Sequence, residues 1–170
     1  MQQERYELIE DQFWLIDEEL GIDLSSTVDD KEVQSYQEGF PRSICYRKKG
    51  ELHGPSTYYS KTSQLLSVTW YYLGEKVGKV LRHYPNGSLY SVERFVDGER
   101  HLRQDYYYLD QTLKASTGYQ FGKLDGVTRL FWPDGKLKRE AYFKEGQLQG
   151  EEKFFDEEGR SIGKMAAALS

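Results

Sequence analysis

Glycine recurs along this chain at one fixed interval, at Gly50, Gly74, Gly98, Gly122 and Gly146. A second glycine follows four positions after most of them. Aromatic and leucine columns keep the same phase, so several residue types repeat in one register. Such a period predicts a repeat protein in which each unit packs only on its neighbours.

Each unit contains two turn signals. Pro-Asn-Gly at residues 85–87 and Pro-Asp-Gly at residues 133–135 predict tight corners, and the periodic glycine supplies the second reversal. Two reversals leave strands of roughly five to nine residues. The predicted fold is therefore mainly β, an elongated single-layer antiparallel meander of about five 24-residue hairpin repeats. The many glycines and the lack of a helical apolar period argue against helical repeats over residues 44–160.

Two segments carry a family resemblance: HYPNGSL at residues 83–89 and FWPDGKL at residues 131–137. Each is followed by an aromatic residue and then by a glycine turn. This pattern resembles the MORN (membrane occupation and recognition nexus) repeat, in the bacterial variant form often labelled a toxin–antitoxin antitoxin. The resemblance covers residues 50–159 and departs from the family pattern at residues 60–64 and 109–111. It implies a single-layer β scaffold for protein association, sometimes for phospholipid contact.

The N-terminal region has a different pattern. Its apolar residues at spacings of three or four predict an amphipathic helix over residues 3–20, and a shorter helix is expected after Ser26 or Thr27, ending near Gly39. The predicted organisation is an acidic helical segment (1–40), a β-repeat domain (41–163) and a tail (164–170) that is either a short helix or loose. We expect the first helix to dock on the sheet through Tyr6, Ile9, Phe13, Ile16 and Leu20.

The charge distribution limits the classes of partner. The net charge is -5 and the pI about 5.3, but residues 1–40 carry 12 acidic and 2 basic side chains, so the remainder is basic. An acidic pI and an acidic arm oppose nucleic-acid binding. The sequence shows neither a signal peptide nor an apolar run long enough to span a membrane, and one cysteine permits no internal disulfide. A cytoplasmic location is expected.

The sequence offers no arrangement of residues that predicts catalysis. His53 and His101 occupy one column of the repeat, yet four strand spacings would separate them by about 19 Å, too far for a shared metal. Cys45 has no base at a spacing that would activate it, and the adjacent acidic residues fall at turns. We therefore expect no enzyme activity, metal, cofactor or small-molecule substrate.

The predicted function is protein association through an exposed aromatic stripe formed by Tyr84, Tyr108 and Trp132, which adjacent repeats would place about 10 Å apart. The partner is another protein, or another copy of this chain. If the N-terminal segment covers that stripe, the exposed column is instead Tyr59, Tyr107, Phe131 and Phe155.

Two alternatives follow from the basic residues and from the resemblance. One is peripheral binding to anionic membrane lipid through Lys48, Lys49, Lys136, Lys138 and Arg139. The other is neutralisation of a partner toxin.

Overall fold

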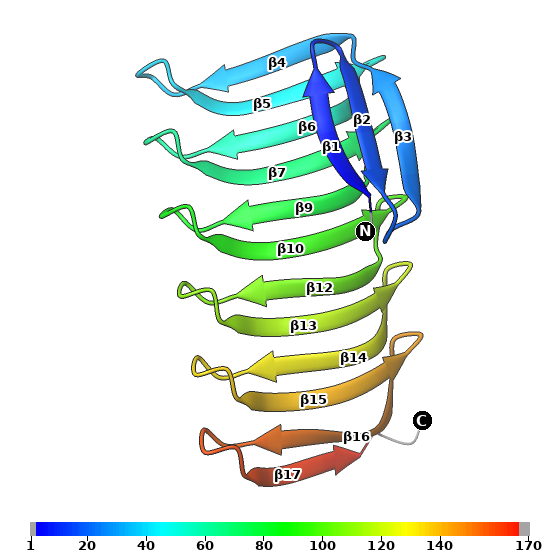
Figure 1. Cartoon of the computed structure of the whole chain (residues 1–170), viewed down its shortest axis with the longest axis vertical. Coiled ribbons are helices and arrows are strands. Elements are labelled where there is room, and N and C mark those ends of the chain that lie inside the picture. The colour runs from blue at the N-terminus through cyan, green and yellow to red at the C-terminus, as the bar shows by residue number, and fades with distance from the viewer. Residues whose placement is uncertain (1–2, 167–170) are drawn as a thin grey trace.

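The computed structural model describes residues 3–166, which form two antiparallel β-sheets and contain no helix (Figure 1). The predicted β architecture is confirmed, and the predicted N-terminal helices are wrong. A small sheet has the order β1-β2-β3, and a 14-stranded sheet contains the other strands. The strands are β1 (Glu4–Ile9), β2 (Gln12–Asp17), β3 (Ile22–Thr27), β4 (Asp30–Ser35), β5 (Pro41–Lys48), β6 (Glu51–Tyr59), β7 (Leu65–Tyr72), β8 (Glu75–Lys76), β9 (Gly78–His83), β10 (Leu89–Val96), β11 (Glu99–Arg100), β12 (Leu102–Tyr107), β13 (Leu113–Gln120), β14 (Lys123–Phe131), β15 (Leu137–Lys144), β16 (Gln147–Phe155) and β17 (Ser161–Ala166).

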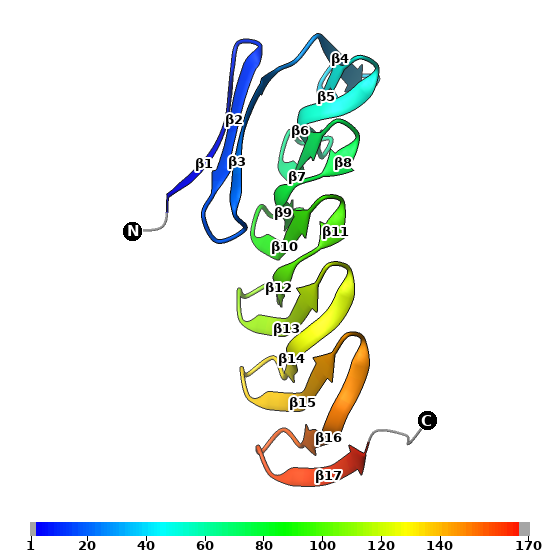
Figure 2. The same ribbon diagram turned by 90° about the vertical axis from the view of Figure 1, so that its right-hand side faces the viewer.

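The large sheet is a meander of stacked hairpins. Twelve strands follow one another in chain order from β4 at one edge to β17 at the other, and the short strands β8 and β11 pair beside β7 and β10. The hairpin corners all lie along one long edge and the glycine turns along the other (Figure 1). In the view turned by 90°, the small sheet lies against the upper part of this stack (Figure 2).

The corners share one hydrogen-bond pattern, whatever their sequence. In the Pro-Asn-Gly corner, the Tyr84 N–H donates to the carbonyl of Ser88 (2.8 Å) and the Gly87 N–H donates to the carbonyl of Tyr84 (2.9 Å). The same two bonds recur at all six corners, including the two that depart from the family pattern. There Ser63 and Gln111 take the positive φ that glycine takes elsewhere. These two backbone hydrogen bonds, rather than the presence of Pro or Gly, are therefore what all the corners share.

The segment predicted as two helices is a three-stranded sheet followed by strand β4. The inward side chains alternate along each strand: Tyr6 pairs with Leu15 and Leu8 pairs with Phe13 across β1 and β2. Glu10, with φ of 55°, makes the turn between them. Ile9 is 54% exposed because it points away from the large sheet. The helix-like spacing combines apolar residues from both faces of each strand, because Tyr6 and Phe13 point inward whereas Ile9 and Ile16 lie on the other face.

The large sheet begins at β4, since Val33 pairs with Ile44 of β5. At the other end, Lys164 pairs with Lys153 of β16, so the first residues of the predicted tail extend strand β17. The rest of that tail, residues 167–170, lies outside the described residues.

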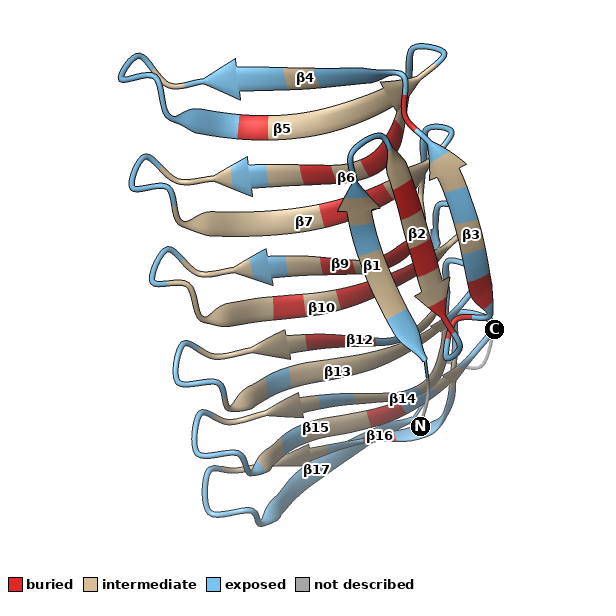
Figure 3. Cartoon of the chain, turned by 45° about the horizontal axis from the view of Figure 1, so that its top comes forward, coloured by how far each residue is buried: buried red, intermediate tan, exposed pale blue. Residues whose placement is uncertain are grey.

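One row of side chains explains where the small sheet sits. Cross-strand pairs connect one residue of each of the twelve strands into a continuous line, which we call the transverse row. Its first half is apolar apart from one threonine, and its second half is polar. Buried residues concentrate in β2 and in the strands from β5 to β12, and few lie from β13 onward (Figure 3). In order, the members of the transverse row are Val33, Ile44, Thr57, Val68, Leu81, Val92, Asp105, Ser116, Arg129, Glu140, Lys153 and Lys164.

The small sheet contributes most of the hydrophobic core. Phe13 and Leu15 of β2 are fully buried, and the ring of Phe13 packs against Trp70 at a centroid distance of 5.9 Å. The core also contains Leu20, Ile22, Val28 and Val77. Full burial of such a side chain stabilises a fold by about 1.5–3 kcal/mol before entropy costs.

Polar contacts also hold the small sheet in position. The Tyr6 hydroxyl donates to Asp17 (2.6 Å) and accepts from the backbone N–H of Lys79 (3.0 Å). Burial, and then the Asp17 carboxylate, raise the pKa of Tyr6 far above its usual value, so the hydroxyl keeps its proton. At the tip of the sheet, Glu19 approaches Arg94 at 3.5 Å, and Arg94 pairs with the buried Asp105.

Candidate functional site

The opposite side of the large sheet, which we call the open face, carries the candidate site. Within residues 3–166, the small sheet lies on the other side of the large sheet and leaves this side uncovered (Figure 2). Its central column is nevertheless buried, including Ser56, Thr69, Val80, Gln104 and Ala141. Most of these side chains are small, so the larger side chains on either side of the column shield them from solvent.

An aromatic column runs along the glycine-turn side of the open face. Tyr71 lies opposite Gly54, Phe95 opposite Gly78, Tyr119 opposite Leu102 and Phe143 opposite Gly126. The two central rings also receive cations. Lys76 lies 5.2 Å from the Phe95 ring centroid, and Arg100 lies 5.7 Å from that of Tyr119. Three of the four aromatic residues in this column thus lie opposite a glycine.

A charged group, which we call the Glu93 cluster, occupies the middle of the open face. Glu93 of β10 is buried, and its carboxylate accepts from Arg82 of β9 (2.9 Å) and from Arg100 of β11 (3.1 Å). The two arginine side chains are 46% and 44% exposed. One buried carboxylate thus fixes two half-exposed guanidinium groups, which keep N–H donors directed to solvent.

Tyrosines surround the Glu93 cluster. Burial raises the pKa of Tyr106, and the negative charge of Glu93 raises it further. Burial also raises the pKa of Tyr71. The rings of Tyr106 and Tyr90 lie 6.0 Å apart, and Tyr90 packs edge-on against Tyr84 at 5.2 Å. The cluster is therefore continuous with the hairpin corners.

The predicted stripe of Tyr84, Tyr108 and Trp132 lies in one line along the corners. The hydroxyl of Tyr84 donates to the carbonyl of Tyr107 in the next corner (2.8 Å), Tyr108 donates to Phe131 (2.9 Å), and the Trp132 indole donates to Phe155 (3.2 Å). Each ring is half-buried. The alternative column, Tyr59, Tyr107, Phe131 and Phe155, supplies carbonyl acceptors for these bonds and for one from Tyr36. The stripe thus ties neighbouring hairpins together.

The structure does not gather the predicted lipid-binding residues in one place. Lys48 and Lys49 lie at the first glycine turn, and Lys48 donates to Ser26 (3.0 Å). Seven strands lie between β5 and β15 in the order of the sheet, and in the fifth hairpin Lys136 pairs with Asp134 (2.8 Å).

The other two residues of this set are also engaged. Lys138 lies 4.0 Å above the Trp132 ring, and Arg139 pairs with Glu152.

The histidines and the cysteine have structural contacts. His53 is buried against Phe13, and its Nδ1 accepts from the backbone N–H of Leu73 (3.0 Å). His101 accepts from Phe121 in the same way (3.4 Å). Burial, and then Glu32, raise the pKa of the Cys45 thiol. Residues 3–166 contain no cluster of three or more metal-ligating side chains.

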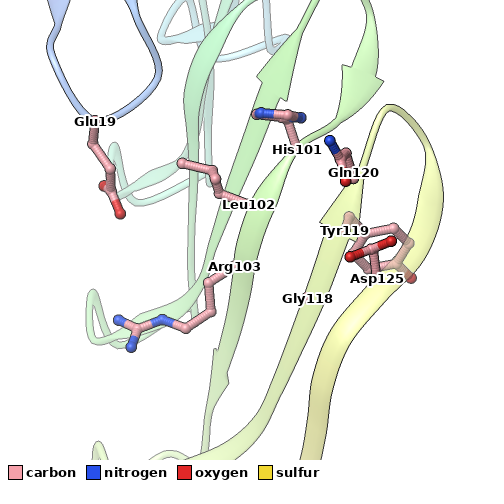
Figure 4. A pocket seen from close by; sticks show the side chains of 8 residues that line it. All are labelled: Glu19, His101, Leu102, Arg103, Gly118, Tyr119, Gln120 and Asp125. Atoms are coloured by element: carbon pink, nitrogen blue, oxygen red, sulfur yellow. The ribbon is translucent and has the colours of Figure 1, made fainter. Parts of the chain in front are cut away.

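A cavity of about 570 Å³ opens where the tip of the small sheet ends above β12 and β13 (Figure 4). Glu19 and Arg103 lie on one side of it, and His101, Gln120 and Asp125 lie on the other. Its charged groups already have partners, since Arg103 pairs with Asp105 (2.9 Å) and Asp125 with Lys144 (3.0 Å). This cavity therefore offers no set of free groups converging on a ligand.

Comparison with known proteins identifies one of these hairpins as a known repeat. Residues 124–145 match the family model described as MORN repeat variant. The match covers one hairpin and supports a MORN repeat there, and the same corner hydrogen bonds recur in the other hairpins. The matched MORN segment extends from within β14 through the corner at Trp132 to the end of β15. No curated protein matches this sequence. Within the described part of the chain, no helix is long and apolar enough to cross a membrane.

The Glu93 cluster was not among the sites predicted from the sequence. The period itself contains the signal, because Arg82 falls in the same column of the repeat as Tyr58 and Tyr106. Arg100 likewise occupies the column of Lys76, one repeat later. A charged residue at a repeat position that is aromatic in other units marks a place where this unit has a surface of its own.

Proposed function

We propose that this chain is a non-enzymatic MORN scaffold that binds another protein through the open face, centred on the Glu93 cluster. The observation that carries the proposal is the contrast between a buried carboxylate and the two half-exposed arginines that it holds. Fixed guanidinium groups among tyrosine rings lose little side-chain entropy on binding. Tyr and Arg are also enriched among the residues that dominate binding energies at protein interfaces.

The predicted stripe adds to this surface. Tyr84 connects it to Tyr90 and Tyr106 through ring contacts, so the corner edge and the centre of the open face form one aromatic area. Tyr36, Tyr84, Tyr108 and Trp132 also link successive hairpins, which keeps the area rigid.

A matched pair of variants tests the proposal. Arg100→Gln removes a charge from the open face, whereas Arg129→Gln removes one from a side chain of similar exposure on the opposite face, where it pairs with Glu140. Proteins from a lysate of the source cells that bind the tagged wild type should be retained by Arg129→Gln and lost from Arg100→Gln. Equal retention by both variants would contradict an open-face site.

The two other predicted activities have their own experiments. Sedimentation with phosphatidylserine vesicles that is abolished by Lys136→Glu would favour the membrane hypothesis. Rescue of growth when the chain is co-expressed with the product of a neighbouring gene would favour toxin neutralisation, which is one form of protein binding.

A further inference from the structure

The transverse row has a regular numbering. The residue numbers of its members increase alternately by a smaller and a larger interval, from Val33 to Ile44, then to Thr57, and so on to Lys164. One smaller and one larger interval together make one 24-residue repeat. The interval that ends at Lys164 is a smaller one, so a larger interval comes next. Counted from Lys164, that larger interval ends at the position that corresponds to Val33 six repeats later.

The two edge strands also have compatible directions. β4 runs toward the corner edge, because the corner at residues 36–40 follows it, and β17 runs away from that edge, because it follows the corner at residues 156–160. Every pair of neighbouring strands in the sheet combines these two directions. A β17 placed beside a β4 would therefore continue the antiparallel alternation.

We propose that a second copy of this chain adds head to tail, with β17 of one copy pairing with β4 of the next. Lys164 then lies opposite Val33 of the next copy. The rows on either side place Gly163 opposite Gln34 and Met165 opposite Glu32. The contact uses different surfaces on the two copies and does not close on itself, so the product is a linear assembly whose length rises with concentration.

Within residues 3–166, β4 and β17 are the two edge strands of the large sheet, each paired on one side only. All six residues of β17 are exposed, with Ile162 at 65% and Met165 at 62%, and five of the six residues of β4 are exposed. Natural edge strands are usually blunted by proline, charge or a covering element. β17 contains a single charged residue, Lys164, whereas β4 carries Asp30 and Glu32 with one lysine. The two edge strands thus carry opposite net charges. This favours pairing of β17 with β4 over pairing of either strand with a copy of itself.

Val33 provides a test in the full-length chain, because its side chain is 48% exposed and either charge can replace it without disturbing the core. Val33→Glu places a carboxylate opposite Lys164 of the neighbouring copy, and Val33→Lys places an ammonium there. Directly opposed charges attract or repel across a strand pair, so the dissociation constant measured by sedimentation over a concentration series should fall about two- to fivefold for Val33→Glu and rise by a similar factor for Val33→Lys.

Net charge alone predicts the reverse order. The chain carries -5, so Val33→Lys makes it less negative and reduces repulsion between copies, while Val33→Glu makes it more negative. Tyr142→Glu and Tyr142→Lys, at a 47% exposed position away from both edges, should leave the dissociation constant unchanged apart from this net-charge effect. Circular dichroism confirms that each variant remains folded.

Three results would overturn the proposal: a chain that stays monomeric at every concentration, an order of Val33 variants that follows net charge, or association that responds to Lys164→Glu but not to Val33. The last result would indicate a two-fold contact between two β17 strands. The double variant Val33→Lys with Lys164→Glu should restore association, because it exchanges the two charges expected at the contact.

Discussion

Ser63 has a φ of 61°, the left-handed conformation that glycine has in the neighbouring corner at Gly87. For a residue with a Cβ this conformation costs roughly 1–2 kcal/mol. Ser63→Gly should therefore raise the free energy of unfolding by about 0.5–1 kcal/mol, because some of the gain is offset by entropy of the unfolded chain. Chemical denaturation measures the change.

The converse variant is Gly87→Ser. The serine would have the same unfavourable φ, and its Cβ would meet the Gln64 side chain at 3.0 Å. The free energy of unfolding should therefore fall by about 1–2 kcal/mol. If both variants changed stability in the same direction, the conformation of the corner residue would not be the controlling factor.

At the scale of elements, the small sheet depends on the alternation of its side chains. Phe13→Asp replaces a fully buried ring with a charge and should lower the free energy of unfolding by about 3 kcal/mol or more, with increased binding of an apolar dye. Ile9→Asp, at a 54% exposed position, should change stability by less than about 0.5 kcal/mol. A helical N-terminal segment would make both variants equally damaging.

The contact between the small sheet and His53 makes stability depend on pH. Burial, and then the charge of Lys48, lower the pKa of His53, so the folded chain binds fewer protons here than the unfolded chain. The resulting stability is complete above the unfolded pKa of about 6.5 and is lost as pH falls through the lower folded pKa. From neutral pH downward, wild type should lose more stability than His53→Gln. Parallel thermal unfolding profiles of the two proteins would contradict this.

The sequence was sufficient to predict the repeated hairpins, because each corner is a local structure with its own turn residues. It was insufficient for the first hairpin, where Tyr36 and Gly39 make the same corner without proline. For the small sheet, apolar residues on both faces of β1 and β2 imitate a helical spacing, and only the docking of Phe13 against Trp70, far along the chain, distinguishes strand from helix. The Glu93 cluster likewise joins residues of three strands, and its exposure is set by neighbours distant in sequence.

At the scale of the whole molecule, equivalent repeats make the stack tolerant of losing one complete unit. Deleting residues 122–145 removes one full repeat and joins Phe121 to Gly146, which reproduces a turn found at Phe121-Gly122 and brings β13 beside β16 in antiparallel order. This variant should keep a β-type circular dichroism spectrum and a cooperative thermal transition, at a lower temperature because fewer strands pack together.

A deletion of half a unit serves as the control. Removing residues 134–145 takes out half a repeat and connects β14 to β16, two strands that run in the same direction, through a link too short for a parallel crossover. The spectrum of this variant should show loss of β structure. Equal behaviour of the two deletions would contradict a register set by the repeating unit.

The position of the small sheet also determines when it can dock during synthesis. Phe13 packs on Trp70 and Glu19 approaches Arg94, and both of these partners are synthesised much later than the small sheet. At about 5–20 residues per second, a ribosome needs about 3–15 s to add the intervening chain. During this interval the apolar side of the small sheet has no surface to cover it. The folding of this sheet is therefore governed by the length of nascent chain that has emerged, rather than by its own sequence alone.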